Sequence, residues 1–121
     1  YRRIQCEFRL YLEVMMIKTF TAEEFFSYIR SFEKMYVWCG SDGNSGLFIR
    51  ANPKRAAIMK RKNGYEISCM ITQKGAMFCE EGGLILYGNE FQCDIETDCA
   101  RYEVAVKSDK MAGLMKIILQ T

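Results

Sequence analysis

The chain has 121 residues, of which 50% are hydrophobic and 26% charged, and its formal net charge is +2 at pH 7. This composition is ordinary for a globular domain and excludes a low-complexity or disordered chain. The uncharged apolar runs, such as residues 14–17, are far shorter than the about 20 residues of a transmembrane helix. We expect a single domain over residues 1–121 without membrane contact. Its opening Tyr-Arg-Arg, in place of Met, is compatible with a fragment of a longer protein.

The cysteines lack the spacing of a zinc or redox motif, because no two are separated by just two residues. Those at positions 6, 69 and 93 alternate in phase with apolar neighbours, as reduced thiols in a core do. We therefore expect a reducing, intracellular (cytoplasmic) compartment. A secreted disulfide framework is the alternative, because the number of cysteines is even. The six are Cys6, Cys39, Cys69, Cys79, Cys93 and Cys99.

The N-terminal third predicts a strand followed by a helix. Apolar and polar residues alternate over residues 4–14, which is the period of a half-buried strand. Thr21 followed by Glu24 has the pattern of a capping box, and the flanking phenylalanines have the spacing of a hydrophobic staple. We expect the helix over residues 22–34. Its predicted buried stripe is Phe25, Ile29 and Phe32, flanked by Phe26 and Tyr28.

The rest of the chain predicts antiparallel hairpins and a second helix. Ser108 is a good N-cap, which predicts a helix over residues 109–119 with Met111, Leu114, Met115 and Ile118 buried. The fold class is therefore α+β: a mostly antiparallel curved sheet or partial barrel, one capped helix after the first strand, and a C-terminal helix. The predicted strands are residues 35–40, 47–51, 55–61, 65–72, 76–79, 84–88, 91–97 and 101–107.

The hairpin around Asn63-Gly64 concentrates positive charge. A type I′ turn at these two residues pairs Lys62 with Tyr65 and Arg61 with Glu66. Alternation then places one set of side chains inward and the other outward. The inward set is Ala56, Ile58, Ile67, Cys69 and Ile71, and the outward set is Arg55, Met59, Arg61, Glu66 and Met70. The candidate contact residues are Arg50, Lys54, Arg55, Lys60, Arg61, Lys62 and Tyr65.

Several roles are open for this basic hairpin. It can follow a phosphate backbone while Tyr65 stacks on a base. Its lysines can instead prevent strand-to-strand aggregation at a sheet edge. It can also bind a protein partner, or the acidic stretch of a second copy, steered by complementary charge. The pI of about 8.2 is low for a nucleic-acid-binding domain.

An acidic stretch runs from residue 80 to 103. Within it Asp94, Glu96 and Asp98 alternate along one strand face, while Cys93 and Ile95 mark the buried face. Carboxylates grouped in this way can hold Mg²⁺ or Ca²⁺, but spacing alone specifies such a site weakly. We interpret the three carboxylates as a solvated acidic partner surface, and we predict no metal and no other cofactor.

Catalytic patterns are weak throughout the chain. Histidine is absent, which removes the usual general base near neutral pH. The glycine-rich residues 40–46 lack the ending of a phosphate loop and predict a turn. Cys79 and Cys99 have acidic neighbours, which disfavour a thiolate. We predict a non-enzymatic binding or regulatory module that acts through protein–protein interaction. The alternatives are a nucleic-acid-binding module using the hairpin at residues 50–65, and an enzyme based on carboxylates or a thiol.

Overall fold

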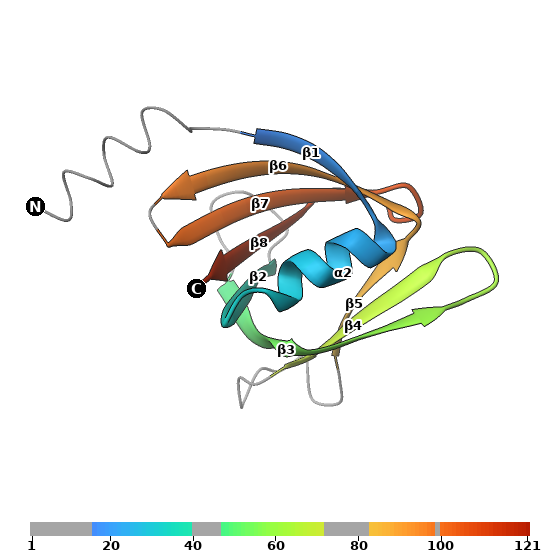
Figure 1. The fold of residues 1–121 in the computed structure, drawn as a ribbon, viewed down its shortest axis with the longest axis horizontal. Coiled ribbons are helices and arrows are strands. Elements are labelled where there is room, and N and C mark those ends of the chain that lie inside the picture. The colour runs from blue at the N-terminus through green and yellow to red at the C-terminus, as the bar shows by residue number, and fades with distance from the viewer. Residues whose placement is uncertain (1–15, 40–46, 72–82, 99) are drawn as a thin grey trace, which may run out of the picture.

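A computed structural model describes residues 16–39, 47–71, 83–98 and 100–121 (Figure 1). Four predictions lie outside the described residues: the strand at 4–14, the turn at 40–46, the strand at 76–79, and the environments of the cysteines at 6, 79 and 99.

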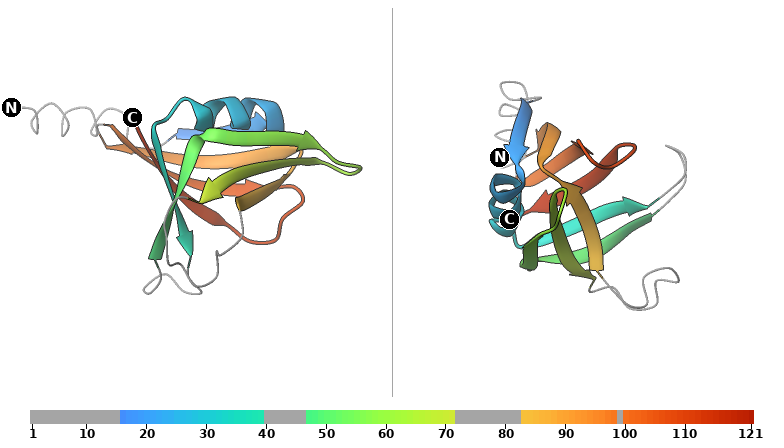
Figure 2. Two further views of the ribbon diagram at one scale, coloured as in Figure 1. Left: turned by 90° about the horizontal axis from the view of Figure 1, so that it is seen from below. Right: turned by 90° about the vertical axis from the view of Figure 1, so that its right-hand side faces the viewer.

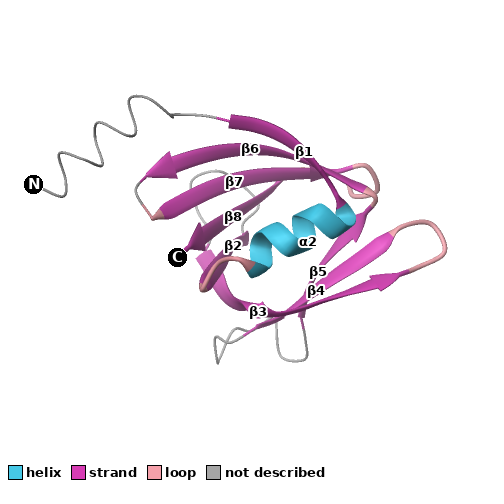
Figure 3. Ribbon diagram, in the orientation of Figure 1, coloured by secondary structure: helices cyan, strands magenta, loops and turns pink. Residues whose placement is uncertain are grey.

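The described part of the chain forms eight strands and one helix (Figure 3). All the strands belong to one antiparallel sheet, in the order β1-β6-β7-β8-β2-β3-β4-β5. A mostly antiparallel sheet with a helix after the first described strand is therefore confirmed. The elements are β1 (Met16–Thr21), α2 (Ala22–Arg30), β2 (Lys34–Cys39), β3 (Leu47–Lys60), β4 (Tyr65–Ile71), β5 (Gly83–Gly88), β6 (Glu90–Asp98), β7 (Arg101–Ser108) and β8 (Met115–Gln120).

The sheet curls around the helix (Figure 2). β5 stands at one end of the strand order and β6 is next to the other end, yet only Asn89 separates them in the chain. The two ends of the sheet must therefore approach each other at Asn89. Helix α2 packs on the inner face, in contact with β1, β3, β4 and β6.

The helix begins and packs as its sequence predicts. The Thr21 hydroxyl accepts a hydrogen bond from the Glu24 N–H at 3.2 Å, and the Glu24 carboxylate accepts one from the Thr21 N–H at 2.9 Å. Phe25 is buried and stacks on Phe91 of β6, with ring centroids 4.9 Å apart. The helix ends at Arg30, four residues earlier than predicted, because Ser31 turns the chain toward β2. Within the described ranges no helix is long and apolar enough to cross a membrane.

The predicted C-terminal helix over residues 109–119 is wrong. Residues 109–114 form a loop, and β8 lies between β7 and β2 as an inner strand of the sheet. Ile117, Ile118 and Leu119 are all buried, as is usual for an inner strand of a sheet. Gly113 has a φ of 85°, which is left-handed and incompatible with a helix interior. Long-range strand pairing therefore overrides a local pattern that resembles a helical stripe.

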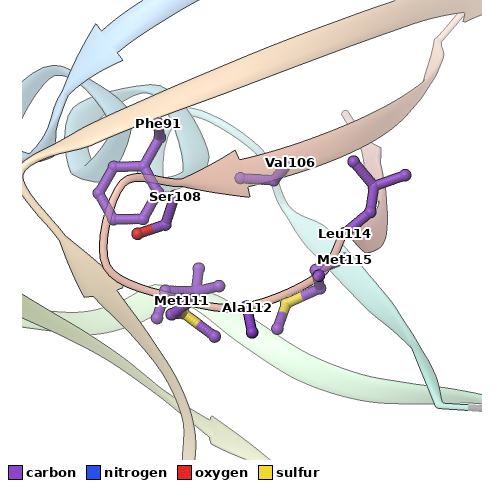
Figure 4. Close-up of a pocket in the computed structure, with 9 residues that line it drawn as sticks. Phe91, Val106, Ser108, Met111, Ala112, Leu114 and Met115 are labelled. Atoms are coloured by element: carbon purple, nitrogen blue, oxygen red, sulfur yellow. The ribbon is translucent and has the colours of Figure 1, made fainter.

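Ser108 has a role other than the predicted N-cap. Its hydroxyl donates a hydrogen bond to the Tyr87 carbonyl and accepts one from the Lys110 N–H. The loop that follows covers an apolar cavity of about 60 Å³ (Figure 4). Ligand sites usually enclose about 300–1,000 Å³, so this cavity is a packing gap rather than a small-molecule site. The residues labelled around it are Phe91, Val106, Ser108, Met111, Ala112, Leu114 and Met115.

The predicted two-residue turn at Asn63-Gly64 is also wrong. Lys60 pairs with Tyr65, so the loop contains residues 61–64, and the Arg61 N–H donates to the Gly64 carbonyl at 2.7 Å. A Cβ at position 64 would lie 3.2 Å from the Tyr87 ring. The close approach of this ring favours glycine at the position. The register differs from the prediction by two residues, so the side chains keep their predicted faces.

Strand β3 bends at a large bulge. Residues 53–56 stand opposite Cys69 alone, between the pairs Asn52–Met70 and Ala57–Ser68. Pro53 is buried there, as a proline inside a sheet can be where the ladder is interrupted. β3 pairs with β2 over residues 47–51 and with β4 from residue 51 onward, on both sides of the bulge.

Candidate interaction surfaces

The six basic candidate residues do not form one continuous surface. Arg50 lies in the first part of β3, opposite Tyr36. Lys54 and Arg55 are exposed on the bulge, and residues 60–62 are exposed at the hairpin tip. At about 3.3 Å per residue, about 33 Å of chain separates the positions 50 and 60. The structure therefore divides the predicted contact surface into three groups.

Lys54 and Arg61 form ion pairs with carboxylates of the described residues. The Lys54 ammonium lies 3.5 Å from the Glu33 carboxylate, and the Arg61 guanidinium lies 3.1 Å from that of Glu66. Exposed pairs of this kind contribute only about 0–1 kcal/mol, so they remain available for exchange with a partner. Tyr65 is partly buried and packs against the core. Because this contact covers part of the Tyr65 ring, less of the ring is free to stack on a base.

The hairpin tip projects beyond the rest of the sheet and is held at its base (Figures 1 and 2). The side-chain amide of Asn89 donates to the Asn63 carbonyl at 3.3 Å, and the Tyr87 ring lies against Gly64. Lys60 and Lys62 are exposed, and neither has an ion-pair partner among the residues that the structure describes. The tip therefore presents these two lysines from a fixed position.

Asp109 organises the corner between β5 and β6, beside the hairpin tip. Its carboxylate accepts hydrogen bonds from the N–H groups of Asn89 at 2.8 Å and Glu90 at 3.1 Å. The hydrogen bond from Glu90, followed by that from Asn89, lowers the pKa of Asp109 below its ordinary value of 3.8. The Asn89 carbonyl in turn accepts from the Ala22 N–H at 3.0 Å. One corner thus connects the start of the helix, the loop before β8 and the hairpin.

The outer face of β3, β4 and β5 carries exposed apolar side chains, here termed the Met face: Met59, Met70 and Ile85. Their side chains are 52%, 52% and 50% exposed, respectively. Ala57 and Ser68 stand between them in the register, so the face is shallow.

Charged side chains border the Met face. The guanidinium of Arg55 lies 3.9 Å from the Met70 sulfur, and the Arg61–Glu66 pair lies at the other end. The sequence placed both methionines on the outer face but did not mark them as contacts, and it missed Ile85. Strand alternation around the inward Leu86 was the signal that could have identified it.

A second surface, here termed the acidic cleft, lies on the outer face of β6, β7, β8 and β3. It is a hollow of about 220 Å³. Asp94 and Glu96 contribute carboxylates from β6, as the sequence predicted for one strand face, and the Asp98 side chain lies outside the described residues. Ile118 of β8, which is buried, also lines the cleft. The residues that line the cleft are Phe48, Asp94, Glu96, Glu103, Val104, Ala105, Lys116, Ile117 and Ile118.

The cleft concentrates negative charge at one side and aromatic surface at the other. Glu103 stands directly opposite Glu96 in the register of β6 and β7, and like charges in this position repel each other. Arg101 partly compensates Glu103 at 3.2 Å. Phe48 packs beside Trp38, with ring centroids 4.9 Å apart. Glu103 was not among the residues predicted for the acidic partner surface. A two-residue turn after Asp98 would have predicted that Glu103 pairs with Glu96.

The described carboxylates and thiols do not group into a metal site. Within the described ranges no group of three or more Cys, Asp or Glu residues is placed to hold a metal ion. Cys69 and Cys93 are buried free thiols, as predicted. Burial raises the pKa of Cys69 to about 11 and that of Cys93 to about 12. Both therefore remain protonated near neutral pH and are poor nucleophiles.

Comparison of the chain with protein-family models, with curated proteins and with solved structures found no match in any of the three.

Proposed function

We propose that this chain is a non-enzymatic binding or regulatory module that contacts a protein partner through the Met face. The observation that carries the proposal is the gathering of Met59, Met70 and Ile85, each about half exposed, on one outer sheet face. Exposed apolar side chains that gather on one face, with polar residues around them, are typical of protein-interaction sites. The flexible thioether of methionine adapts to the shape of a partner, and Met and Arg are both enriched at interfaces.

The same face is poorly suited to nucleic acid. Phosphate groups gain little from methionine side chains, and affinity for them depends on unpaired basic residues. On the adjoining hairpin, phosphate would have to displace the weak carboxylate contacts of Lys54 and Arg61, and Tyr65 packs against the core. The alternative function, nucleic-acid binding by the hairpin at residues 50–65, is supported by the exposure of Lys60 and Lys62 at the projecting tip.

A binding role also agrees with the chemistry of the described residues. The raised pKa values of Cys69 and Cys93 oppose thiol catalysis at these two positions. Free buried thiols are stable in a reducing environment, so we place the module in an intracellular, reducing compartment.

The first test is differential capture of partners from nuclease-treated cell extract. The tagged chain is compared with the double variant Met59→Lys/Ile85→Lys, which places two charges on the Met face. The matched control is Ile17→Lys/Leu114→Lys, which changes two residues that are 68% and 61% exposed elsewhere. We expect the Met-face variant to lose specific proteins that the wild type and the control retain. Identical captured proteins for all three would contradict the proposal.

The second test measures nucleic-acid binding directly. Fluorescence anisotropy of labelled single- and double-stranded DNA and RNA is followed at about 0.05 M and about 0.5 M NaCl, on either side of physiological screening. We expect no specific binding. Salt-sensitive binding that Lys60→Glu/Lys62→Glu abolishes would favour the nucleic-acid alternative.

A further inference from the structure

The acidic cleft presents negative charge that the described basic residues neutralise only in part, since Arg101 pairs with Glu103 and Lys116 lies in the lining. Asp94 and Glu96 are exposed, and no other described side chain forms an ion pair with them. Glu103 adds a third carboxylate directly opposite Glu96, whereas Lys116 is the one basic residue in the lining. A cationic group entering the cleft would reduce this repulsion. Phe48 provides an aromatic surface at the edge, against which an ammonium group packs favourably.

The chain carries a complementary cationic element in its own hairpin tip. Lys60 and Lys62 are exposed there, and the tip stands clear of the body of the molecule (Figure 1). A lysine ammonium on its flexible stem can reach into a shallow cleft.

The tip cannot reach the cleft of its own molecule. Asn89 holds the tip at Asn63, immediately before β6 begins. At about 3.3 Å per residue, Asp94 lies about 17 Å and Glu96 about 23 Å along β6 from Asn89. These distances exceed the span of a lysine side chain. Contact between tip and cleft therefore requires two molecules.

We propose that the acidic cleft binds the basic hairpin tip of a second copy of this chain. The argument rests on complementary charge, on the projection of the tip and on the separation of the two surfaces within one molecule. The contact joins two different surfaces, so it can close as a two-fold pair in which each tip enters the cleft of the other molecule, or continue head to tail as a ring or open chain. The acidic cleft is distinct from the Met face, and the inference holds whether or not the Met face binds a partner.

The test is sedimentation velocity of the purified chain with charge-reversed variants. Lys60→Glu/Lys62→Glu reverses the tip, and Asp94→Lys/Glu96→Lys reverses the cleft. We expect the wild type to self-associate at about 0.05 M NaCl and to dissociate, with an at least tenfold weaker association constant, at about 0.5 M NaCl. Each variant alone should remain monomeric, because its tip and cleft then carry like charges.

A mixture of the two variants distinguishes charge complementarity from damage to the fold. Each acidic tip then meets a basic cleft and each basic tip meets an acidic cleft, so the mixture should associate again. Lys107→Glu/Lys110→Glu makes the same charge change as the tip variant at exposed sites elsewhere and should associate like the wild type. If circular dichroism shows that the reversed cleft unfolds, Asp94→Asn/Glu96→Gln replaces it and should weaken wild-type association.

Three results would overturn the inference: a wild type that is monomeric at low salt, variants that still associate, or a mixture of folded variants that does not. The Met-face variant Met59→Lys/Ile85→Lys retains tip and cleft and should still self-associate. Failure of this inference is therefore distinguishable from failure of the proposed function, which is measured by capture of other proteins.

Discussion

The inner and outer faces of the sheet differ sharply in what they expose. On the inner face Ile67, Leu86 and Phe91 are at most 1% exposed and pack around the helix, whereas on the outer face Met59 and Ile85 are about half exposed. Both faces come from the same strands, since side chains alternate along each one.

This difference in exposure suggests that the inner face stabilises the fold and that the outer face binds partners. Apolar area buried on the inner face contributes about 25 cal/mol per Å² to folding. Exposed apolar and charged side chains on the outer face contribute little to folding and remain available to partners. Substitutions on the two faces should therefore have separable effects.

The largest expected effect on stability comes from the centre of the inner face. Phe25→Ala removes the ring that stacks on Phe91 and should lower the free energy of unfolding by about 3–5 kcal/mol. Phe26→Ala, at the partly buried edge of the helix, is the matched control and should cost less than half as much. The measurement is urea denaturation followed by circular dichroism. Equal losses for both variants would show that the inner face lacks the packing described.

The corner at β5 and β6 should respond next most strongly. In Gly88→Ala the new Cβ overlaps the Ser108 hydroxyl and lies 2.8 Å from the Asp109 carboxylate, so we expect a loss of about 1–3 kcal/mol. Gly113→Ala serves as control, because its φ of 85° costs about 1 kcal/mol while no atom lies within 4 Å of the new Cβ. Comparable denaturation midpoints for the two variants would argue against close packing at the corner.

Low pH should destabilise both the corner at Asp109 and the N-terminus of α2, where Glu24 lies. Hydrogen bonds lower the folded-state pKa of Asp109 and of Glu24, so their stabilisation is complete above the unfolded pKa values and is lost as pH falls through the folded ones. Asp109→Asn should be less stable than wild type at neutral pH, and the difference should shrink at about pH 3. Urea denaturation at both pH values measures it. A difference that is constant or grows in acid would contradict this role.

The smallest effect concerns the inner-face thiols. Cys69 and Cys93 are buried and their pKa values are raised, so they should resist alkylation by N-ethylmaleimide in the native state and react after unfolding. Peptide mass spectrometry identifies the modified positions. Rapid native labelling of either residue would show that the inner face opens readily.

Local patterns in the sequence predicted the parts of the fold that local forces decide. The capping box at Thr21 and the stripe at Phe25 and Ile29 depend on residues within a few positions, and both are confirmed. Strand β8 depends instead on pairing with β2 and β7. The sequence pattern of residues 109–119 contains no information about those neighbours, so a helix was predicted where the chain forms a strand.

The candidate surfaces were also predicted only where local alternation decides them, and not where long-range strand pairing does. Alternation placed Met59 outward correctly, because the register error was an even number of residues. The bulge at residues 53–56 and the folding of β3 across two partners separate basic residues that are close in sequence. Glu103 joins Glu96 only through the pairing of β6 and β7. Charge counts along a chain do not predict such juxtapositions.

The most direct measurement of the central claim compares stability and binding on one preparation of the Met-face variant Met59→Lys/Ile85→Lys. The outer-face account predicts that its free energy of unfolding changes by less than about 1 kcal/mol, as expected for surface substitutions, while the specific partner proteins are lost. A fall of more than about 2 kcal/mol, or an unchanged set of captured proteins, would contradict the assignment of the Met face to binding rather than to folding.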